Sequence, residues 1–143
     1  MKKYQIIYAD PPWSFDGRKL NAKTNGVEIT DHYSVMNDGE IVNLPIKELV
    51  DTNSVLFMWV VYSKLPLALK VMEAWGFRYT TVAFEWLKTT GYNLKAHQFM
   101  GGNVVAGAIE LCLLGKKGNI KRQSKTVKRL IVSPLGEHSV KPP

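Results

Sequence analysis

The residues best suited to chemistry stand at the end of the first apolar run, Tyr4–Ala9, where Asp10, Pro11, Pro12 and Trp13 follow one another. Prolines cannot extend a sheet ladder or enter a helix interior, so the backbone must turn away there. The turn brings together a carboxylate acceptor, proline carbonyls without a regular partner and a flat aromatic ring. Such a set predicts a site for a planar molecule that carries an amino group. The alternative interpretation of this short string is a plain proline-rich turn.

The elements that must position this junction are those of an α/β fold. We expect Tyr4–Ala9 to form a buried strand, and the ligand crevice of an open α/β sheet lies at the carboxyl ends of its strands. The apolar run 55–61 predicts a strand buried on both faces, and further strands are predicted at 78–87, 108–114 and 127–133. Strands separated by at least one clear helix favour a layered α/β fold over an all-β one.

Helices and long irregular segments are expected between these strands. A short helix is predicted at 44–50, and a longer one begins after a Ser63 cap and ends at Gly76. The irregular segments are residues 14–31, which suit a lid over the strand ends, and residues 89–102.

Length and composition predict one compact domain over residues 1–143. The chain is 45% hydrophobic and 22% charged, as in ordinary globular proteins, and no apolar run approaches the roughly 18 residues that span a bilayer. A signal peptide is not expected, because Asp10 and the prolines interrupt the apolar run near the start. The single cysteine, Cys112, excludes an internal disulfide framework. We therefore expect a cytoplasmic protein without a membrane partner.

The net charge of +7 is concentrated in one stretch, residues 111–136, which holds seven basic residues and no acid. Outside that stretch 12 basic and 12 acidic residues cancel, so it carries the whole excess. Concentrated positive charge attracts phosphate backbones by releasing counterions, which predicts a nucleic-acid contact. A solvated surface loop is the alternative. The seven residues, called the basic window below, are Lys116, Lys117, Lys121, Arg122, Lys125, Lys128 and Arg129.

The remaining candidates point to structure rather than chemistry. His32, His97 and His138 lack the spacing of metal ligands, so no metal site is predicted. Cys112 lies within an apolar strand and is expected in the core. Three tryptophans on predicted strand or helix positions are expected there too, namely Trp59, Trp75 and Trp86.

Several strings of residues occur in a fixed order after Asp10 to Trp13. They are Val-Leu-Phe-Met-Trp-Val at 55–60, Glu-Ala-Trp-Gly-Phe-Arg-Tyr at 73–79, Glu-Leu-Cys-Leu-Leu-Gly at 110–115 and Glu-His-Ser-Val-Lys-Pro at 137–142. In this combination the sequence closely resembles the MT-A70 family of adenine-N6 methyltransferases. The resemblance runs from about Tyr4 to the last residue, and the combination is far more specific than any one string.

The resemblance implies a Rossmann-like sheet with flanking helices that transfers a methyl group from S-adenosylmethionine to the exocyclic amine of adenine. Asp10 and the Pro11 carbonyl would accept hydrogen bonds from that amine, and Trp13 would hold the adenine by its aromatic face. Lys141 resembles the family lysine that helps to bind the cofactor. The implied residues are Asp10, Pro11, Pro12 and Trp13 for catalysis, and Asp10, His138, Ser139 and Lys141 for the cofactor.

The chain departs from the family pattern in two places. Residues 104–108 read Val-Val-Ala-Gly-Ala where the family usually carries a Trp-Thr-Arg-x-Asn-like stretch, so a cation and an amide are missing. Family proteins also continue past Lys-Pro into a helix, a Glu-Leu-Phe-like strand and a Gly-Trp-Asp-type tail, whereas this sequence stops at Pro143. We therefore expect the C-terminal cofactor-binding segment to be absent and the fold to be incomplete at that end.

The leading functional hypothesis is an adenine-N6 methyltransferase that acts on DNA in preference to RNA, with nucleic acid as its partner and a homo- or heterodimer as a possible assembly. The second hypothesis is a catalytically inactive or truncated domain that serves in nucleic-acid or partner binding. The third is a structural fragment without a ligand.

Overall fold

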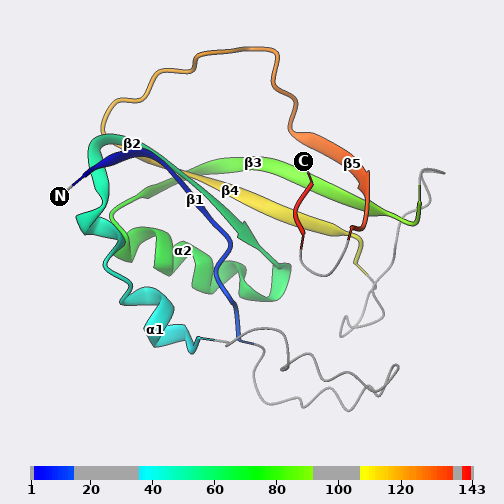
Figure 1. Cartoon of the computed structure of the whole chain (residues 1–143), viewed down its shortest axis with the longest axis horizontal. Helices are drawn as coiled ribbons and strands as arrows, with labels where there is room; N and C mark the ends of the chain where they lie inside the picture. The colour runs from blue at the N-terminus through cyan, green and yellow to red at the C-terminus, as the bar shows by residue number, and fades with distance from the viewer. Residues whose placement is uncertain (1, 15–35, 92–106, 137–139, 143) are drawn as a thin grey trace.

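The computed structural model describes residues 2–14, 36–91, 107–136 and 140–142 of the chain. Within these ranges it contains a five-stranded sheet with two α-helices on one face (Figure 1). Expectations that concern residues 15–35, residues 92–106, His138 and Ser139 lie outside the described residues.

The sheet has the strand order β1-β2-β4-β3-β5. Strands β1, β2, β3 and β5 run in one direction, whereas β4 is antiparallel to both of its neighbours. The carboxyl ends of four strands and the start of β4 therefore meet at one end of the sheet, called the carboxyl end below. The expected α/β class with a Rossmann-like sheet and flanking helices is confirmed. The strands are β1 (Tyr4–Ala9), β2 (Val50–Val60), β3 (Arg78–Thr89), β4 (Ile109–Lys117) and β5 (Leu130–Pro134).

Two α-helices, α1 (Asp38–Val42) and α2 (Leu65–Ala74), cover one face of the sheet, and α2 contacts β2 and β3 (Figure 1). In the described part of the chain no helix is long and apolar enough to cross a membrane. The main core lies between the helices and the sheet, since the apolar residues of each element bury there together. Its fully buried members include Leu56, Met58, Val60, Ala68, Val71, Met72 and Leu113.

A second, smaller cluster lies on the other face of the sheet. Side chains alternate between faces along a strand, so Trp59 of β2 points away from its neighbours Met58 and Val60. Trp59 packs there with Trp86 and Cys112, and all three are buried. The core positions expected for these residues, and for Trp75 in the main core, are confirmed.

The first strand is less buried than its apolar sequence predicts. It forms an outer strand of the sheet, so it pairs only with β2 among the described strands. Ile7 and Ala9 pack against the main core, whereas Tyr4, Ile6 and Tyr8 face the other side and are exposed. The expectation of a buried first strand is therefore wrong, because composition alone does not reveal a strand's place in a sheet.

The short helix predicted at 44–50 is also wrong. Only a 3-10 turn, η2 (Ile46–Glu48), forms there, and Val50 already begins β2. The α-helix lies earlier, at α1, where the Asn37 side chain caps the backbone of Glu40 and the Glu40 side chain returns to the Asn37 N–H. This Asn-x-x-Glu capping box was present in the sequence as a signal.

The boundaries of α2 match the prediction at one end only. Ser63 lies in a 3-10 turn, η3 (Tyr62–Lys64), and Lys64 takes the N-cap position, so the predicted Ser63 cap is wrong. At the other end Gly76 has a φ of 88°, and its N–H donates to the Glu73 carbonyl. This left-handed residue stops the helix as predicted.

Candidate active site

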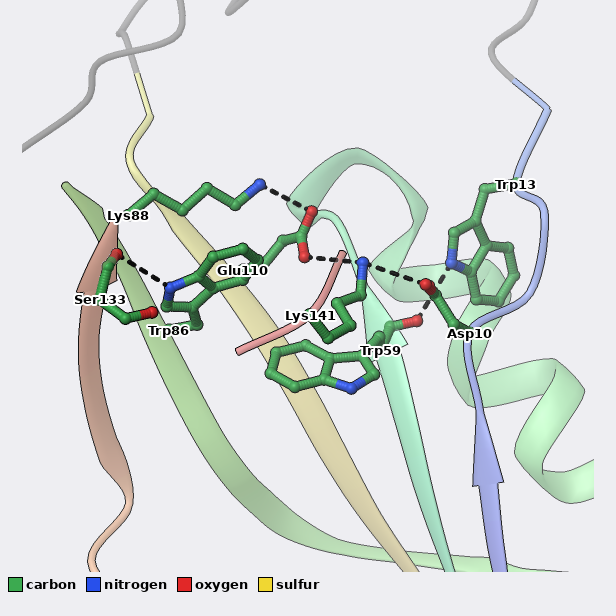
Figure 2. Close-up of polar contacts among 8 residues, drawn as sticks. All are labelled: Asp10, Trp13, Trp59, Trp86, Lys88, Glu110, Ser133 and Lys141. Carbon is green, nitrogen blue, oxygen red and sulfur yellow. Dashed lines mark hydrogen bonds and ion pairs between the residues drawn. The ribbon is translucent and has the colours of Figure 1, made fainter. Parts of the chain in front are cut away.

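The topology gathers four charged side chains at the carboxyl end of the sheet. Asp10 directly follows β1, Glu110 lies near the start of β4, Lys88 lies near the end of β3, and Lys141 lies in the described segment beyond β5. Trp86 pairs with Glu110 across β3 and β4, which brings Lys88 and Glu110 onto neighbouring positions. Figure 2 shows these residues pointing toward one another.

The four side chains form a continuous series of ion pairs, called the charge row below. The Lys141 ammonium lies 3.1 Å from Asp10 Oδ2 and 3.0 Å from Glu110 Oε2. The other oxygen of Glu110, Oε1, accepts a hydrogen bond from Lys88 Nζ at 2.8 Å. Three of the side chains are 11 to 15% exposed, whereas Asp10 is 39% exposed. Asp10 is therefore the end of the row that a ligand can reach.

Aromatic rings lie beneath both lysines of the charge row. Lys141 Nζ lies 5.6 Å from the centre of the Trp59 ring, and Lys88 Nζ lies 5.0 Å from that of Trp86. The two indoles meet edge to face at 6.3 Å. The Trp59 indole N–H donates to the Tyr8 hydroxyl, and that of Trp86 to the Ser133 carbonyl. Cation–π contacts thus add to the ion pairs of both lysines.

The pKa values of the two carboxylates in the charge row are shifted in opposite directions. Burial raises the pKa of Asp10 above its ordinary value, and the nearby Lys141 offsets this only in part. Burial also raises the pKa of Glu110, but the hydrogen bond from Lys88 and the charge of Lys141 outweigh it, so that pKa is lowered. Burial lowers the pKa of Lys141, but Glu110 and Asp10 outweigh it and raise that pKa. Glu110 and Lys141 are therefore firmly charged, whereas Asp10 is easier to protonate.

Trp13 anchors the Asp-Pro-Pro-Trp segment to the sheet. Its side chain is only 7% exposed, and its indole N–H donates to the Trp59 carbonyl at 3.1 Å. Its backbone N–H donates to the Pro11 carbonyl at 2.8 Å, so that carbonyl has the partner that the sequence analysis did not expect. Pro11 is buried and Pro12 half-buried. The ring of Trp13 packs into the core, and its contact with an adenine stays a prediction.

Of the predicted site residues that the structure describes, Asp10 and Lys141 lie next to each other. The residues of the basic window lie elsewhere. Lys116 pairs with Val55, at the opposite end of β4 from Glu110. Beyond β4, residues 118–129 contain no helix or strand. Lys116 and Lys117 therefore belong to β4. The other five window residues lie in the segment between β4 and β5, and the carbonyl of the last of them, Arg129, accepts a hydrogen bond from the Glu85 N–H of β3.

Three contributors to the site were missed as functional residues. Glu110 appeared only as the first letter of the Glu-Leu-Cys-Leu string, and Lys88 and Tyr8 were not singled out. The sequence did contain a signal for two of these residues. Lys88 directly follows one predicted strand and Glu110 lies near the start of another, and charged residues that are buried at such places are usually paired. No group of three or more His, Cys, Asp or Glu residues suited to a metal ion occurs in the described ranges.

An open pocket of about 550 Å³ lies away from this cluster, beside the end of α2 and the start of β3. Its lining includes Glu73, Phe77 and Arg78, at the end of β3 opposite Lys88. The charge row, rather than this pocket, combines buried charges with an accessible carboxylate. The row is therefore the better candidate active site.

Comparison with known proteins connects this geometry to a family. The profile of the MT-A70 family matches residues 4–143. The chain is 30% identical to the type II methyltransferase M.MunI of Mycoplasma sp, over 99% of this chain and 64% of that protein. It is 26% identical to an N(6)-adenosine-methyltransferase MT-A70-like protein of Arabidopsis thaliana, over 97% of this chain and 18% of the relative.

A third relative carries a different description. It is the N6-adenosine-methyltransferase non-catalytic subunit MTB of Arabidopsis thaliana, 31% identical over 85% of this chain and 15% of that protein. The chain thus spans just under two thirds of the bacterial relative and less than a fifth of the two plant proteins. The family match covers all but the first three residues, and the chain therefore belongs to the MT-A70 family.

Proposed function

We propose that this chain is an adenine-N6 methyltransferase domain that methylates nucleic acid, with DNA as the preferred substrate. The observation that carries the proposal is Asp10, an accessible carboxylate at the carboxyl end of the sheet that terminates an otherwise buried row of charges. Family membership and the description of plant relatives as N(6)-adenosine-methyltransferases support the same reaction. We also propose that residues 1–143 form one domain and that it resides in the cytoplasm.

The proposed role of Asp10 is to orient the amine rather than to remove its proton first. Lys141 contacts Oδ2, which leaves Oδ1 to accept an N–H of the exocyclic amine together with the second lone pair of the Pro11 carbonyl. The nitrogen lone pair then points away from these acceptors, and a proton leaves to solvent once the new N–C bond has formed. Orientation of this kind supplies much of a barrier reduction when the leaving group is good.

S-adenosylmethionine would supply the methyl group on a sulfonium, a good leaving group that departs as a neutral thioether. The charged groups of the charge row fit such a cofactor, because a sulfonium cation and an amino-acid ammonium both favour a nearby carboxylate. Asp10 offers that carboxylate, and Lys141 keeps one of its three N–H donors beyond the two ion pairs. We propose Asp10 and Lys141 as cofactor contacts; the same role for His138 and Ser139 stays a prediction.

The basic window is proposed to hold the nucleic-acid backbone at a distance from the reacting base. Lys116 pairs with Val55, and Leu111 with Val60 at the carboxyl end. The five-residue separation corresponds to roughly 17 Å along the strand. A duplex base must leave its stack to be methylated, so phosphates several nucleotides away need a separate anchor. None of the seven basic side chains is in an ion pair with another residue that the structure describes.

The experiment that tests the proposed function is methyl transfer from radiolabelled S-adenosylmethionine to adenine-containing DNA and RNA oligonucleotides. Asp10→Asn keeps the shape of the side chain but weakens its acceptor, and we expect at least a roughly hundredfold loss of kcat. Asp51→Asn, at the other end of the sheet, is the matched control and should behave as the wild type. Undiminished transfer by Asp10→Asn would refute the assigned role.

A non-catalytic binding domain is the second candidate function, because one relative of similar identity is described as a non-catalytic subunit. Such a domain would work in a homo- or heterodimer with an active partner. Titration calorimetry with S-adenosylmethionine separates the two candidates. Binding supports the enzyme, whereas no heat at millimolar cofactor together with salt-sensitive oligonucleotide binding supports the binding domain.

A further inference from the structure

The adenine of the proposed reaction needs an aromatic face that a ligand can reach. Enzymes that act on a base outside its stack hold the base between aromatic or apolar side chains. Trp13 is only 7% exposed, and its ring packs in the main core. Its indole N–H is bound to the Trp59 carbonyl at 3.1 Å. In this arrangement Trp13 offers little free ring surface to a base.

Four aromatic side chains of the described ranges are exposed, namely Tyr4, Tyr8, Tyr62 and Tyr79. Tyr4 and Tyr79 lie at the starts of β1 and β3, at the end of the sheet opposite the charge row. Tyr8 lies within β1, and its hydroxyl is bound by the indole N–H of Trp59. Of these four residues, Tyr62 lies beyond the carboxyl end of a strand, two residues after the end of β2.

The pairing of β1 with β2 places Tyr62 close to Asp10. Ala9 pairs with Met58, so Asp10 lies one residue and Tyr62 four residues beyond that pair. The offset of three residues corresponds to roughly 10 Å along the strands, a gap that an adenine ring and a tyrosine side chain fill together. The Tyr62 side chain is 54% exposed. A ligand bound outside the carboxyl ends of the strands can therefore reach its ring.

A series of polar contacts ties the turn of Tyr62 to the segment that follows Asp10. Tyr62 begins η3, and Lys64 ends it. The Lys64 side chain is 9% exposed, and its ammonium lies 3.4 Å from Asp38 Oδ1. The same oxygen accepts a hydrogen bond from the Ser14 hydroxyl at 2.9 Å. Because Ser14 is four residues after Asp10, these contacts hold the turn and the Asp10 segment in a fixed relation.

We propose that Tyr62 is a substrate-binding residue whose ring stacks on the adenine that Asp10 orients. The proposal rests on the proposed function, since Asp10 is there the acceptor of the adenine amine. Its ligand is an adenine outside its stack, either flipped from a duplex or in a single strand. Asp10 holds the amino edge of the base and Tyr62 one of its faces, so the two contacts together fix the orientation of the ring.

The binding test uses two single strands of thymine nucleotides, one with a single central adenine and one with an abasic nucleotide in its place. By fluorescence anisotropy, we expect the wild type to bind the adenine strand roughly five- to hundredfold more tightly. Tyr62→Ala should remove most of this difference, whereas Tyr62→Phe should keep it. The matched control is Tyr4→Ala, which removes a tyrosine of similar exposure (42%) at the other end of the sheet.

Two results of the binding test would overturn the proposal. One is a wild type that binds both strands equally, and the other is a Tyr62→Ala variant that distinguishes them as well as the wild type does. In the methyl-transfer assay, Tyr62→Ala should raise the KM for the adenine strand by a similar factor. Circular dichroism should show the same fold for all variants, because the Tyr62 side chain is exposed.

One measurement needs neither activity nor a destabilising variant. In ¹⁹F NMR of the wild type labelled with 3-fluorotyrosine, the Tyr62 signal, assigned with Tyr62→Phe, should move when adenosine is added, and that of Tyr4 should not. A Tyr62 signal that stays in place would overturn the proposal. If the wild type transfers no methyl group but this signal moves, the proposed function fails while the contact stands. Methyl transfer with an unchanged KM in Tyr62→Ala would overturn the contact alone.

Discussion

At the scale of single residues, the two carboxylates of the charge row differ because of their neighbours. Glu110 lies between two lysines and is 13% exposed, whereas Asp10 has Lys141 on one oxygen and is 39% exposed. The two lysines lower the pKa of Glu110 against the effect of burial, while the single one does not fully offset burial at Asp10. The charge row therefore contains one carboxylate that stays charged, Glu110, and one that is easier to protonate, Asp10.

The raised pKa of Asp10 predicts a stability penalty at neutral pH. A carboxyl whose pKa is higher in the folded state binds protons more tightly there, so folding stability decreases as pH rises from about 4 through the folded pKa. Asp10→Asn removes this charge. We therefore expect its urea midpoint to exceed that of the wild type at pH 8 and to equal it near pH 3.

Urea denaturation followed by tryptophan fluorescence at both pH values checks this prediction, with Asp51→Asn as the control. Together with the expected loss of activity, the result would show a residue retained for function at the expense of stability. A lower midpoint for Asp10→Asn at pH 8 would mean that the ion pair with Lys141 outweighs burial.

At the scale of elements, the approach of α2 to the sheet depends on the glycine that ends the Glu-Leu-Cys-Leu-Leu-Gly string. A Cβ added to Gly115 would lie 2.6 Å from Met72 Cε of α2 and 3.0 Å from Phe77 Cβ. Gly115 pairs with Leu56 of β2 and with Tyr79 of β3, so it lies in the middle of the sheet. The absence of a side chain there lets the helix pack closely.

Gly115→Ala is predicted to destabilise the fold by about 1 to 3 kcal/mol, because the extra methyl overpacks this contact. Gly107→Ala is the matched control, since a Cβ there meets no atom of the described residues within 4 Å. Thermal or urea denaturation of both variants measures the difference. Equal stability would show that the flexible Met72 side chain moves aside at little cost.

The Asp-Pro-Pro-Trp segment is a second case in which elements decide the role of a residue. The Trp13 ring is packed in the main core, and its N–H is bound to the backbone of β2. Its contacts hold the residues that follow β1 in place beside Asp10. Trp13 thus fixes the backbone next to Asp10 by attaching it to β2.

At the scale of the whole molecule, the chain separates its two groups of unusual charge. The balanced charge row lies at the carboxyl end of the sheet, whereas the unbalanced basic window begins at the other end of β4. Long-range attraction of a polyanion depends on the unbalanced group. In the proposed function, the balanced group orients the base locally.

Neutralising part of the basic window should weaken nucleic-acid binding without changing the chemistry at Asp10. For the triple variant Lys121→Gln, Arg122→Gln and Lys125→Gln, we expect the slope of log K against log salt for duplex DNA to fall by roughly 2 to 3. Fluorescence anisotropy at several salt concentrations measures this slope. An unchanged slope would show that the window is only a solvated surface. The control neutralises three lysines outside the window, Lys2, Lys47 and Lys70.

The sequence by itself determined the fold class, most strands and the family. Runs rich in apolar and β-branched residues located most of the described strands within three residues, and β2 within five. Gly76 located the end of α2. These signals are local, so the sequence carries them. Ordered strings along the chain indicated the MT-A70 family, which the family match bears out. The predicted helix at 44–50 failed because its apolar residues serve a 3-10 turn and the start of β2.

Only the tertiary structure decided which residues share a site. Asp10, Lys88, Glu110 and Lys141 come from four separate parts of the chain, and their contacts depend on strand order and register. The exposure of β1 and the burial of Trp13 likewise follow from the place of β1 in the sheet. Burial and pairing of charges are properties of neighbours in space, and for this chain they turn one accessible aspartate into the reachable end of a buried row.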